Sequence, residues 1–241
     1  MPANSNAQSG NRILAALPAD EYERLLPHLK PVILEYRQVL FEPHKTIQYS
    51  YFPEDSIISM VSFMMDKTIV EVGLAGREGM VCVATFLGAN SSPHQCIVQG
   101  QGSAIRIKAS ALREEFTRGG RLQDLLLRYT QAHLVQVAQT SVCNRLHALE
   151  SRLCRWLLMI HDRADGDEFL LTHDIISIML GAQRTGVTDT AGTLQKKRII
   201  SYSRGRLAVL DRQKLEETSC ECYWIVREEY DRLTRARTPS H

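Results

Sequence analysis

The sequence predicts an α+β protein made of an antiparallel β-roll, a long helix and a C-terminal winged helix-turn-helix. Three observations support this fold class. Residues 31–108 contain short β-rich runs separated by turn residues. Residues 121–142 contain neither glycine nor proline and form one helical pattern. Residues 169–210 then change from a helical pattern, broken by a glycine, to two short strands joined by a basic turn.

The composition is that of a globular protein with a packed core. The chain has 241 residues, of which 44% are hydrophobic and 23% are charged. No apolar run approaches the about 20 residues that span a bilayer. Met1 to Asn11 also lack the basic and apolar segments of a signal peptide. We therefore expect a cytoplasmic protein without membrane contact, in which residues 1–11 form a flexible tail.

Residues 12–118 are expected to form the roll. Asn11 to Leu29 has a helical pattern that Pro18 and Pro27 interrupt. Closely spaced strands with glycine and proline between them then indicate an antiparallel roll. The expected strands are Val32–Tyr36, Ile47–Phe52, Ile57–Met64, Thr68–Leu74, Cys96–Gln99 and Ala104–Lys108. A helix over Ala109 to Arg118 completes this part of the chain.

Residues 119–143 are expected to form a dimerisation helix. Arg121 to Val142 would span about 33 Å as a helix. Residues on one face follow at spacings of four, three, four and four: Leu122, Leu126, Tyr129, His133 and Val137. Because Leu127 and Leu134 make the helix apolar beyond this face, one face can pack on the roll while another meets a partner chain. A helix buried wholly within its own domain is the alternative.

Residues 144–241 are expected to form the winged helix-turn-helix domain, which begins with a helix over Leu146 to Arg163 and ends with one over Leu215 to Leu233. Thr172 is a good N-cap for the first helix of the motif. Gly181 can adopt the positive φ of the turn that follows. The second helix starts near Gln183, and two strands with a tight turn over Ser203 to Arg206 form the wing.

Basic residues are concentrated in this C-terminal segment. Residues 172–214 carry eight Lys and Arg against three Asp, a net charge of +5. Since the whole chain carries +2, the other residues together carry −3. A basic domain on a slightly acidic body favours a nucleic-acid partner, although a solvated charged face would give the same count.

The second helix is expected to enter the major groove of double-stranded DNA with its N-terminal side chains. The candidate reading residues are Gln183, Arg184, Thr185, Thr188 and Asp189. An arginine at position 184 can bridge O6 and N7 of guanine, worth about 1–3 kcal/mol of discrimination. Thr172 at the start of the first helix, with Arg204 and Arg206 on the wing, are candidate phosphate ligands.

The chain resembles the Crp/Fnr (cyclic-AMP receptor protein and fumarate-nitrate regulator) superfamily of transcription regulators. The specific motif is Leu171-Thr-x-x-x-Ile-x-x-Met-Leu-Gly181-x-x-Arg184-x-x-Val187, followed by Ile199-Ile-Ser. Residues 73–80 also resemble a glycine-rich turn of one subgroup. The resemblance implies a cyclic-nucleotide-binding-like roll and a homodimer that reads a pseudo-palindromic operator, with half-sites about 34–36 Å apart. RNA polymerase and an unidentified small-molecule effector are further candidate partners.

Departures from the family pattern exclude some ligands. Where cyclic-AMP binders hold ribose and phosphate, this chain has Cys82-Val83 and His94-Gln95, so cyclic AMP is not the expected effector. No cysteine precedes Cys82, so an N-terminal iron–sulfur cluster is not expected. Of the family's Arg-Glu-x-x-x-Arg reading set only Arg184 is retained, which predicts a distinct operator.

The six cysteines are expected to be reduced thiols. Cys220-x-Cys222 could sense oxidation or bind a metal, but no Cys or His follows it at zinc spacing. We therefore expect structural thiols there, no metal and no other cofactor.

Two other classes of function are a metal oxygenase built on the roll and a regulator that does not read DNA. A metal oxygenase built on the roll would need two His and a carboxylate at one metal, and His44 and His94 form no His-x-His pair, so no enzymatic activity is expected. A dimeric regulator that acts through protein partners without reading DNA remains the alternative. Gly186 and Gly192 motivate it, since each weakens the second helix by up to about 1 kcal/mol, and so does Asp189, which can repel phosphate.

Overall fold

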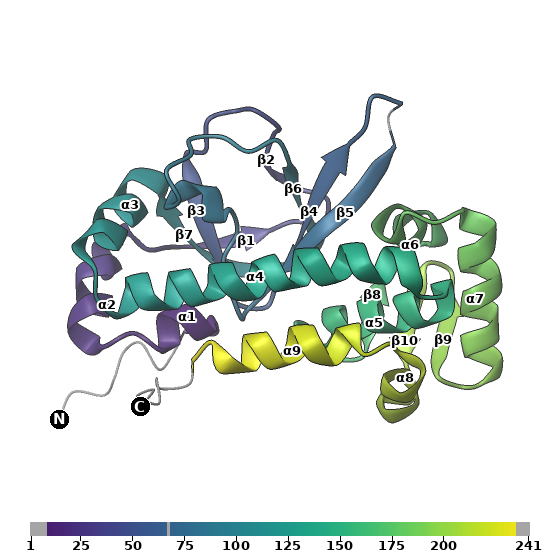
Figure 1. The fold of residues 1–241 in the computed structure, drawn as a ribbon. Helices are drawn as coiled ribbons and strands as arrows, with labels where there is room; N and C mark the ends of the chain where they lie inside the picture. Colours follow the sequence, from purple (N-terminus) through teal and green to yellow (C-terminus); the bar gives the residue numbers. More distant parts are fainter. Residues whose placement is uncertain (1–8, 67, 235–241) are drawn as a thin grey trace.

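The computed structural model describes residues 9–66 and 68–234 (Figure 1). A roll of two sheets lies against one side of a long helix, and a helix-turn-helix with a small sheet lies at the far end of that helix (Figure 1). The expected α+β class, with its roll, long helix and winged helix-turn-helix, is confirmed. Among the described residues, no helix has the length and apolar character needed to cross a bilayer.

The N-terminal segment packs on the body of the protein. Residues 1–8 of the expected tail lie outside the described residues. Asn11, at the end of that tail, is fully buried. Its side chain accepts hydrogen bonds from the first turn of α1 (Arg12–Ala15) and donates to the carbonyl groups of Pro53 and Gly79, both at 2.8 Å. The helices α2 (Ala19–Leu25) and η2 (Leu26–His28) follow, interrupted at the two prolines as predicted.

The roll consists of two antiparallel sheets. The first has the order β1 (Lys30–Leu34), β7 (Gly102–Lys108), β3 (Tyr49–Pro53), and the second has the order β2 (Val39–Phe41), β6 (Gln95–Gly100), β4 (Ile57–Phe63), β5 (Ile69–Ala75). Six of these strands were predicted to within a few residues. Strand β2 has no recognisable sequence pattern, because it has only three residues and its pairing with β6 is irregular. A short 3-10 helix, η3 (Val83–Thr85), lies in the connection between β5 and β6 of the second sheet.

The long helix α4 (Arg121–Leu146) has 26 residues and follows α3 (Ala109–Arg118). It buries one face against its own roll, as the apolar pattern predicted: Leu122, Leu125, Leu126, Tyr129 and Ala132 are all buried. The glycine-rich turn lies under this face. A Cβ atom at Gly79 would lie 1.9 Å from the Tyr129 ring, so only glycine fits there.

The C-terminal half begins with α5 (Leu149–His161) and β8 (Glu168–Leu170). The helices α6 (His173–Leu180) and α7 (Arg184–Lys196) and the strands β9 (Ile200–Ser203) and β10 (Arg206–Val209) follow. Strand β8 pairs with β10, so the wing is a three-stranded sheet rather than the predicted two-stranded hairpin. The polar composition around β8 concealed this third strand, which has only three residues.

The predicted tail helix is two helices, α8 (Arg212–Thr218) and α9 (Cys222–Arg232), separated near Ser219. The Ser219 hydroxyl donates to the Glu216 carbonyl at 2.8 Å and thereby satisfies the end of α8. Helix α9 then runs back along α4 (Figure 1). Its residues Val226 and Tyr230 join the apolar cluster that contains Tyr129 of α4. The sequence pattern by itself does not indicate where this segment packs.

Two buried polar contacts join the roll to the helices. Arg163, just after α5, donates from Nε to the Glu78 carboxylate at 2.8 Å and from Nη2 to Gln136 of α4 at 3.2 Å. Trp156 of α5 donates to the Glu71 carboxylate on β5 at 2.8 Å. These contacts fix the orientation of α5, and hence of the helix-turn-helix, relative to the roll.

Candidate nucleic-acid interface

Helix α6 has the ends that the sequence predicted. The Thr172 hydroxyl accepts a hydrogen bond from the Ile175 backbone N–H at 3.2 Å and caps the N-terminus. Gly181 at the C-terminus has φ of 57°, in the left-handed region. The Arg152 guanidinium of α5 donates to the Leu180 carbonyl and satisfies the last turn. Helix α6 is therefore held at both of its ends.

Helix α7 buries one side and exposes the other. Val187, Ala191 and Leu194 are buried against α5 and α6, as predicted. All five candidate reading residues lie on the exposed side: Gln183, Arg184, Thr185, Thr188 and Asp189. Gln183 stands at the N-cap position without a side-chain cap, so no side chain caps the first amide groups of α7.

Arg184 is engaged in an exposed ion pair that the sequence did not indicate. Its Nε lies 2.7 Å from Oδ1 of Asp174 on α6, and the two side chains are 66% and 65% exposed. An ion pair this exposed contributes about 1 kcal/mol or less. The guanidinium can therefore leave the carboxylate at little cost when a stronger acceptor is offered.

His173 links the reading helix to the wing and was missed by sequence reasoning. Its Nδ1 lies 3.0 Å from the Thr188 hydroxyl of α7, and its ring stacks on Tyr202 of β9 with centroids 4.2 Å apart. Burial, and then the positive charge of Arg184, lower the pKa of His173. A ring between a helix and a wing has no periodic sequence signal, because the two partners lie 15 and 29 positions further along the chain.

The wing ends in a tight turn directly beside α6. Arg204 and Gly205 both have positive φ, 50° and 78°, as in a two-residue type I′ hairpin. Arg204 and Arg206 are exposed. The Gly205 carbonyl accepts from the Leu171 backbone N–H at 2.9 Å, which places the turn next to half-buried Thr172. Candidate phosphate ligands from α6 and the wing therefore come together.

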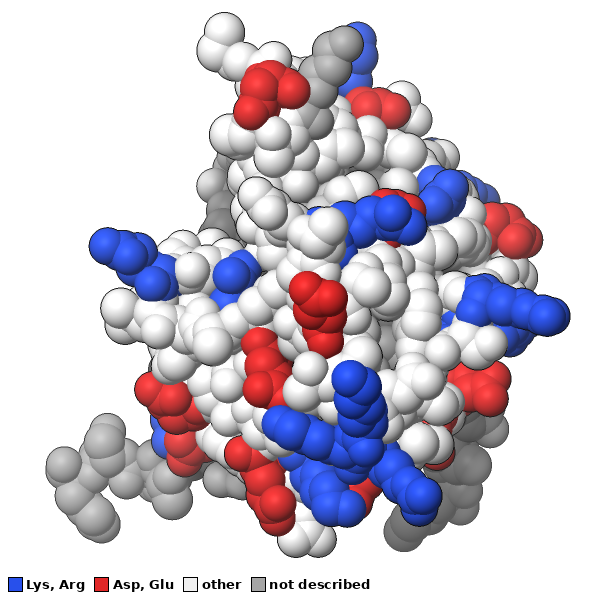
Figure 2. Space-filling model, turned by 90° about the vertical axis from the view of Figure 1, so that its right-hand side faces the viewer, with Lys and Arg blue, Asp and Glu red and all other residues white. Residues whose placement is uncertain are grey.

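The end of the molecule that carries α7 and the wing shows a group of basic side chains (Figure 2). Exposed cations at the C-terminal end of α7 are Lys196, Lys197 and Arg198. Lys197 pairs with Glu150 of α5 at 2.7 Å. Acidic side chains also lie on this face (Figure 2), so the positive charge is grouped rather than continuous. Two acidic residues of the helix-turn-helix, Asp174 and Asp189, are exposed.

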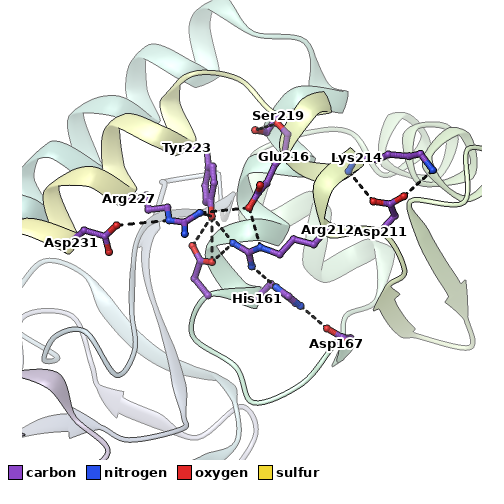
Figure 3. A network of polar contacts seen from close by, with 11 residues as sticks. His161, Asp167, Asp211, Arg212, Lys214, Glu216, Ser219, Tyr223, Arg227 and Asp231 are labelled. Carbon is purple, nitrogen blue, oxygen red and sulfur yellow. Dashed lines mark hydrogen bonds and ion pairs between the residues drawn. The ribbon is translucent and has the colours of Figure 1, made fainter.

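A polar network fixes α8 and α9 to α5 behind this surface (Figure 3). Arg212 donates to Asp162 at 2.6 Å and to the Tyr223 hydroxyl at 2.7 Å, and its Nε donates to Glu216 at 3.0 Å. His161 lies 2.7 Å from Asp167 and extends the network toward β8. These contacts hold α5, α8 and α9 together behind the helix-turn-helix, and the reading side of α7 remains exposed.

Comparison with known proteins identifies this region. Residues 151–218, from α5 to the end of α8, match the family described as the Crp-like helix-turn-helix domain. All eight candidate DNA-binding residues fall within that match. No curated protein matches the chain in sequence.

Solved structures share the fold over most of the chain. A transcriptional regulator of the Crp/Fnr family from Eubacterium rectale has a TM-score of 0.67 and 12% identity, covering 87% of this chain and 98% of its own. FixK2 from Bradyrhizobium japonicum has a TM-score of 0.67 and 13% identity, covering 80% and 98%. The c-di-GMP-responsive regulator CLP from Xanthomonas campestris has a TM-score of 0.62 and 14% identity, covering 80% and 99%. At these identities the comparisons establish the fold.

Proposed function

Because the chain carries a Crp-like helix-turn-helix domain within the fold of the Crp/Fnr regulators, we propose that it is a transcription regulator that binds DNA as a dimer. Helix α7 reads a pseudo-palindromic operator, once in each half-site. The observation that carries the proposal is the exposed N-terminal side of α7, which stands beside the basic wing turn while its opposite side is buried. This arrangement suits insertion of α7 into a major groove with the wing on the flanking phosphates.

The roles of the residues follow from their positions. Arg184 leaves Asp174 and donates to a guanine edge, while Gln183, Thr185, Thr188 and Asp189 contact neighbouring bases. Arg204 and Arg206 bind phosphates from the wing. The Thr172 side-chain oxygen already caps α6. Thr172 therefore acts by orienting the first turn of α6, whose backbone N–H groups can then face a phosphate.

A stripe on α4 supports the dimer. Residues exposed in the single chain follow at spacings of four, three, four, three and four: Leu127, Gln131, Leu134, Ala138, Ser141 and Arg145. This is the seven-residue repeat of a two-stranded coiled coil. Leu127 and Leu134 are 48% and 58% exposed, and a partner helix would bury these apolar side chains. Replacing Leu134 by Glu should give monomers by light scattering, whereas Leu210→Glu on the wing domain should leave the dimer intact.

The residues inside the roll favour an effector other than cyclic AMP. Apolar residues fill the space between the sheets, among them Phe41, Ile58 and Val98. Among the described residues, the buried cations are Arg155 and Arg163, which lie on and just after α5 rather than in the roll. The half-buried Arg106 of β7 lies over the Tyr49 ring, 4.3 Å from its centroid, so a phosphate inside the roll would have to draw this side chain away from the ring. A signal could instead pass through β5, since Val70 of β5 packs at the α6–α7 turn beside Gly181.

The test is binding to DNA obtained by in vitro selection, measured by gel shift at several salt concentrations. Arg184→Ala should weaken binding about 10–100-fold and relax the sequence preference at one position. Arg204→Ala should weaken binding to all sequences and reduce the salt slope by about one. Arg118→Ala, an exposed arginine on α3, is the matched control and should bind as wild type.

An unchanged affinity in Arg184→Ala would overturn the assignment of α7. Absence of any salt-sensitive affinity for DNA would favour the alternative of a dimer that acts through protein partners, with RNA polymerase among the candidates. A DNA-reading role places the protein with the chromosome, in agreement with the cytoplasmic location expected from the sequence.

A further inference from the structure

Four side chains with metal-binding atoms converge where α4 ends and where α8 leads into α9. They are Cys143, His147, Cys220 and Cys222, and their ligand atoms all lie within 4.8 Å of one another. Cys143 Sγ lies 3.5 Å from Cys220 Sγ, and Cys222 Sγ lies 3.5 Å from His147 Nδ1. Around a tetrahedral zinc ion, two sulfurs stand about 3.8 Å apart and a sulfur and a nitrogen about 3.6 Å apart. Two of the pairs therefore already have nearly the spacing of a tetrahedral site, and the remaining pairs lie within 4.8 Å.

The local backbone explains this convergence. Cys143 and His147 are four residues apart at the end of α4, so their side chains project from the same side of the helix. Cys220 lies in the connection before α9, and Cys222 is the first residue of α9. Because Cys220 is outside a helix, the two cysteines of the Cys-x-Cys pair are free to face one point. No Cys or His follows this pair at zinc spacing, because its partners lie 77 and 75 positions before it.

A second layer of contacts orients the ligands. The Nε2 atom of His147 lies 3.3 Å from the Glu221 carboxylate, which leaves Nδ1 directed at the cluster. Gln139 of α4 donates from Nε2 to the Cys222 sulfur at 3.1 Å. A carboxylate behind the ligating histidine and an N–H group on a ligating sulfur are the outer contacts that metal sites use.

Burial and charge also suit a metal. The three cysteines are buried and form an apolar cluster of their own. Three thiolates around a divalent ion leave a net negative charge. Arg155 of α5 is 3% exposed and acts electrostatically on Cys143, so it offsets part of that charge.

We infer that Cys143, His147, Cys220 and Cys222 bind a structural zinc ion. Three sulfurs and one imidazole nitrogen form a closed Cys₃His set, with no ligand position left for water or substrate. The ion joins the end of the proposed dimerisation helix to the segment that follows the wing. It therefore limits how far the helix-turn-helix can rotate relative to α4. Zinc binding itself does not depend on the proposed reading of DNA.

The test uses the full chain, purified under reducing conditions, and elemental analysis of its metal content. About one zinc per chain is expected, and a chelator should lower the melting temperature because zinc binds the folded state. Cys220→Ser and His147→Gln should each lose most of the zinc. Cys82→Ser, a half-buried cysteine in the roll, is the matched control and should keep it.

Cobalt provides a readout that does not depend on how the variants fold. Adding Co²⁺ to chelator-treated wild-type protein should give the visible bands of a tetrahedral cobalt–thiolate site, and Zn²⁺ should abolish them. Wild-type protein that takes up neither ion would overturn the inference, as would Cys220→Ser with unchanged zinc content. If reduced protein binds no metal and a Cys143–Cys220 disulfide forms under oxidising conditions, the cluster would be assigned to thiol redox chemistry instead. These readouts need no DNA, so failure of the proposed operator reading would not affect them.

Discussion

Two arginine–carboxylate pairs with nearly the same geometry occupy opposite environments in this protein. Arg184 and Asp174 on the reading surface are 2.7 Å apart with side chains 66% and 65% exposed. Arg163 and Glu78 at the joint between the roll and the helices are 2.8 Å apart with side chains 5% and 6% exposed. The buried arginine also donates to the Met159 carbonyl and to Gln136.

The difference shows that burial, rather than distance, decides what an ion pair does. In water the attraction between the exposed partners is screened, and the pair opens at a cost of about 1 kcal/mol or less. In the interior, removal of one partner leaves a charge without solvent or counter-charge. The exposed pair is therefore suited to exchange partners with DNA, and the buried pair is suited to hold two parts of the chain together.

The largest effect is expected from breaking the buried pair. Arg163→Met should lower the free energy of unfolding by about 3–5 kcal/mol, because Glu78 is then left buried and unpaired. Urea denaturation measures the change. The double variant Arg163→Met with Glu78→Gln should recover part of the loss. A single variant within about 1 kcal/mol of wild type would contradict the role given to the joint.

A pH effect of up to about 3 kcal/mol is expected from Glu71, the other buried carboxylate at the joint. Burial raises the pKa of Glu71 to about 7. The folded state therefore holds its proton while the unfolded state, with a pKa near 4.5, releases it. The free energy of unfolding should fall as the pH rises from about 4.5 to 7 and then level off.

Glu71→Gln should remove much of this slope, since the amide keeps partners in Ser59 and Trp156 and does not titrate. Glu168→Gln, an exposed carboxylate on β8, is the control. Denaturation curves across this pH range that are as steep in Glu71→Gln as in wild type would show that another group is responsible.

The free energy of unfolding is expected to increase by about 1 kcal/mol when the exposed helix α7 is given a higher helix propensity. No atom lies within 4 Å of a Cβ placed on Gly192, so Gly192→Ala adds helix propensity to α7 without a clash. Gly186→Ala should gain less, because its Cβ would meet Leu149 at 3.2 Å. Thermal unfolding ranks the two variants, and equal gains would mean that α5 does not restrict α7 at Gly186.

The smallest change in stability is expected at the exposed pair. Asp174→Asn should alter the free energy of unfolding by about 1 kcal/mol or less. It should also tighten operator binding several-fold, because Arg184 no longer has a competing carboxylate. Denaturation and gel shift on the same preparation measure both effects. Weaker DNA binding in this variant would mean that Asp174 positions Arg184 for the operator rather than competes with it.

Local chemistry made much of the fold and of the reading surface predictable. The Thr172 cap, the Gly181 turn and the apolar positions of α7 act over a few residues, so their patterns are visible in the sequence and the structure confirms them. Strand β2 and the third wing strand β8 are too short to have a pattern of their own. They exist because longer neighbouring strands supply their hydrogen-bond partners.

Periodicity, capping and turn chemistry act over short distances, so the order of roll, long helix and winged helix-turn-helix can be read from the amino-acid pattern. Packing of the folded chain brings together the charged and sulfur-containing groups: Arg184 with Asp174, Arg163 with Glu78, and Cys143 with Cys220. The partners in the last two pairs are 85 and 77 positions apart. Their meeting depends on how helices pack, and no local pattern records a contact that only packing creates.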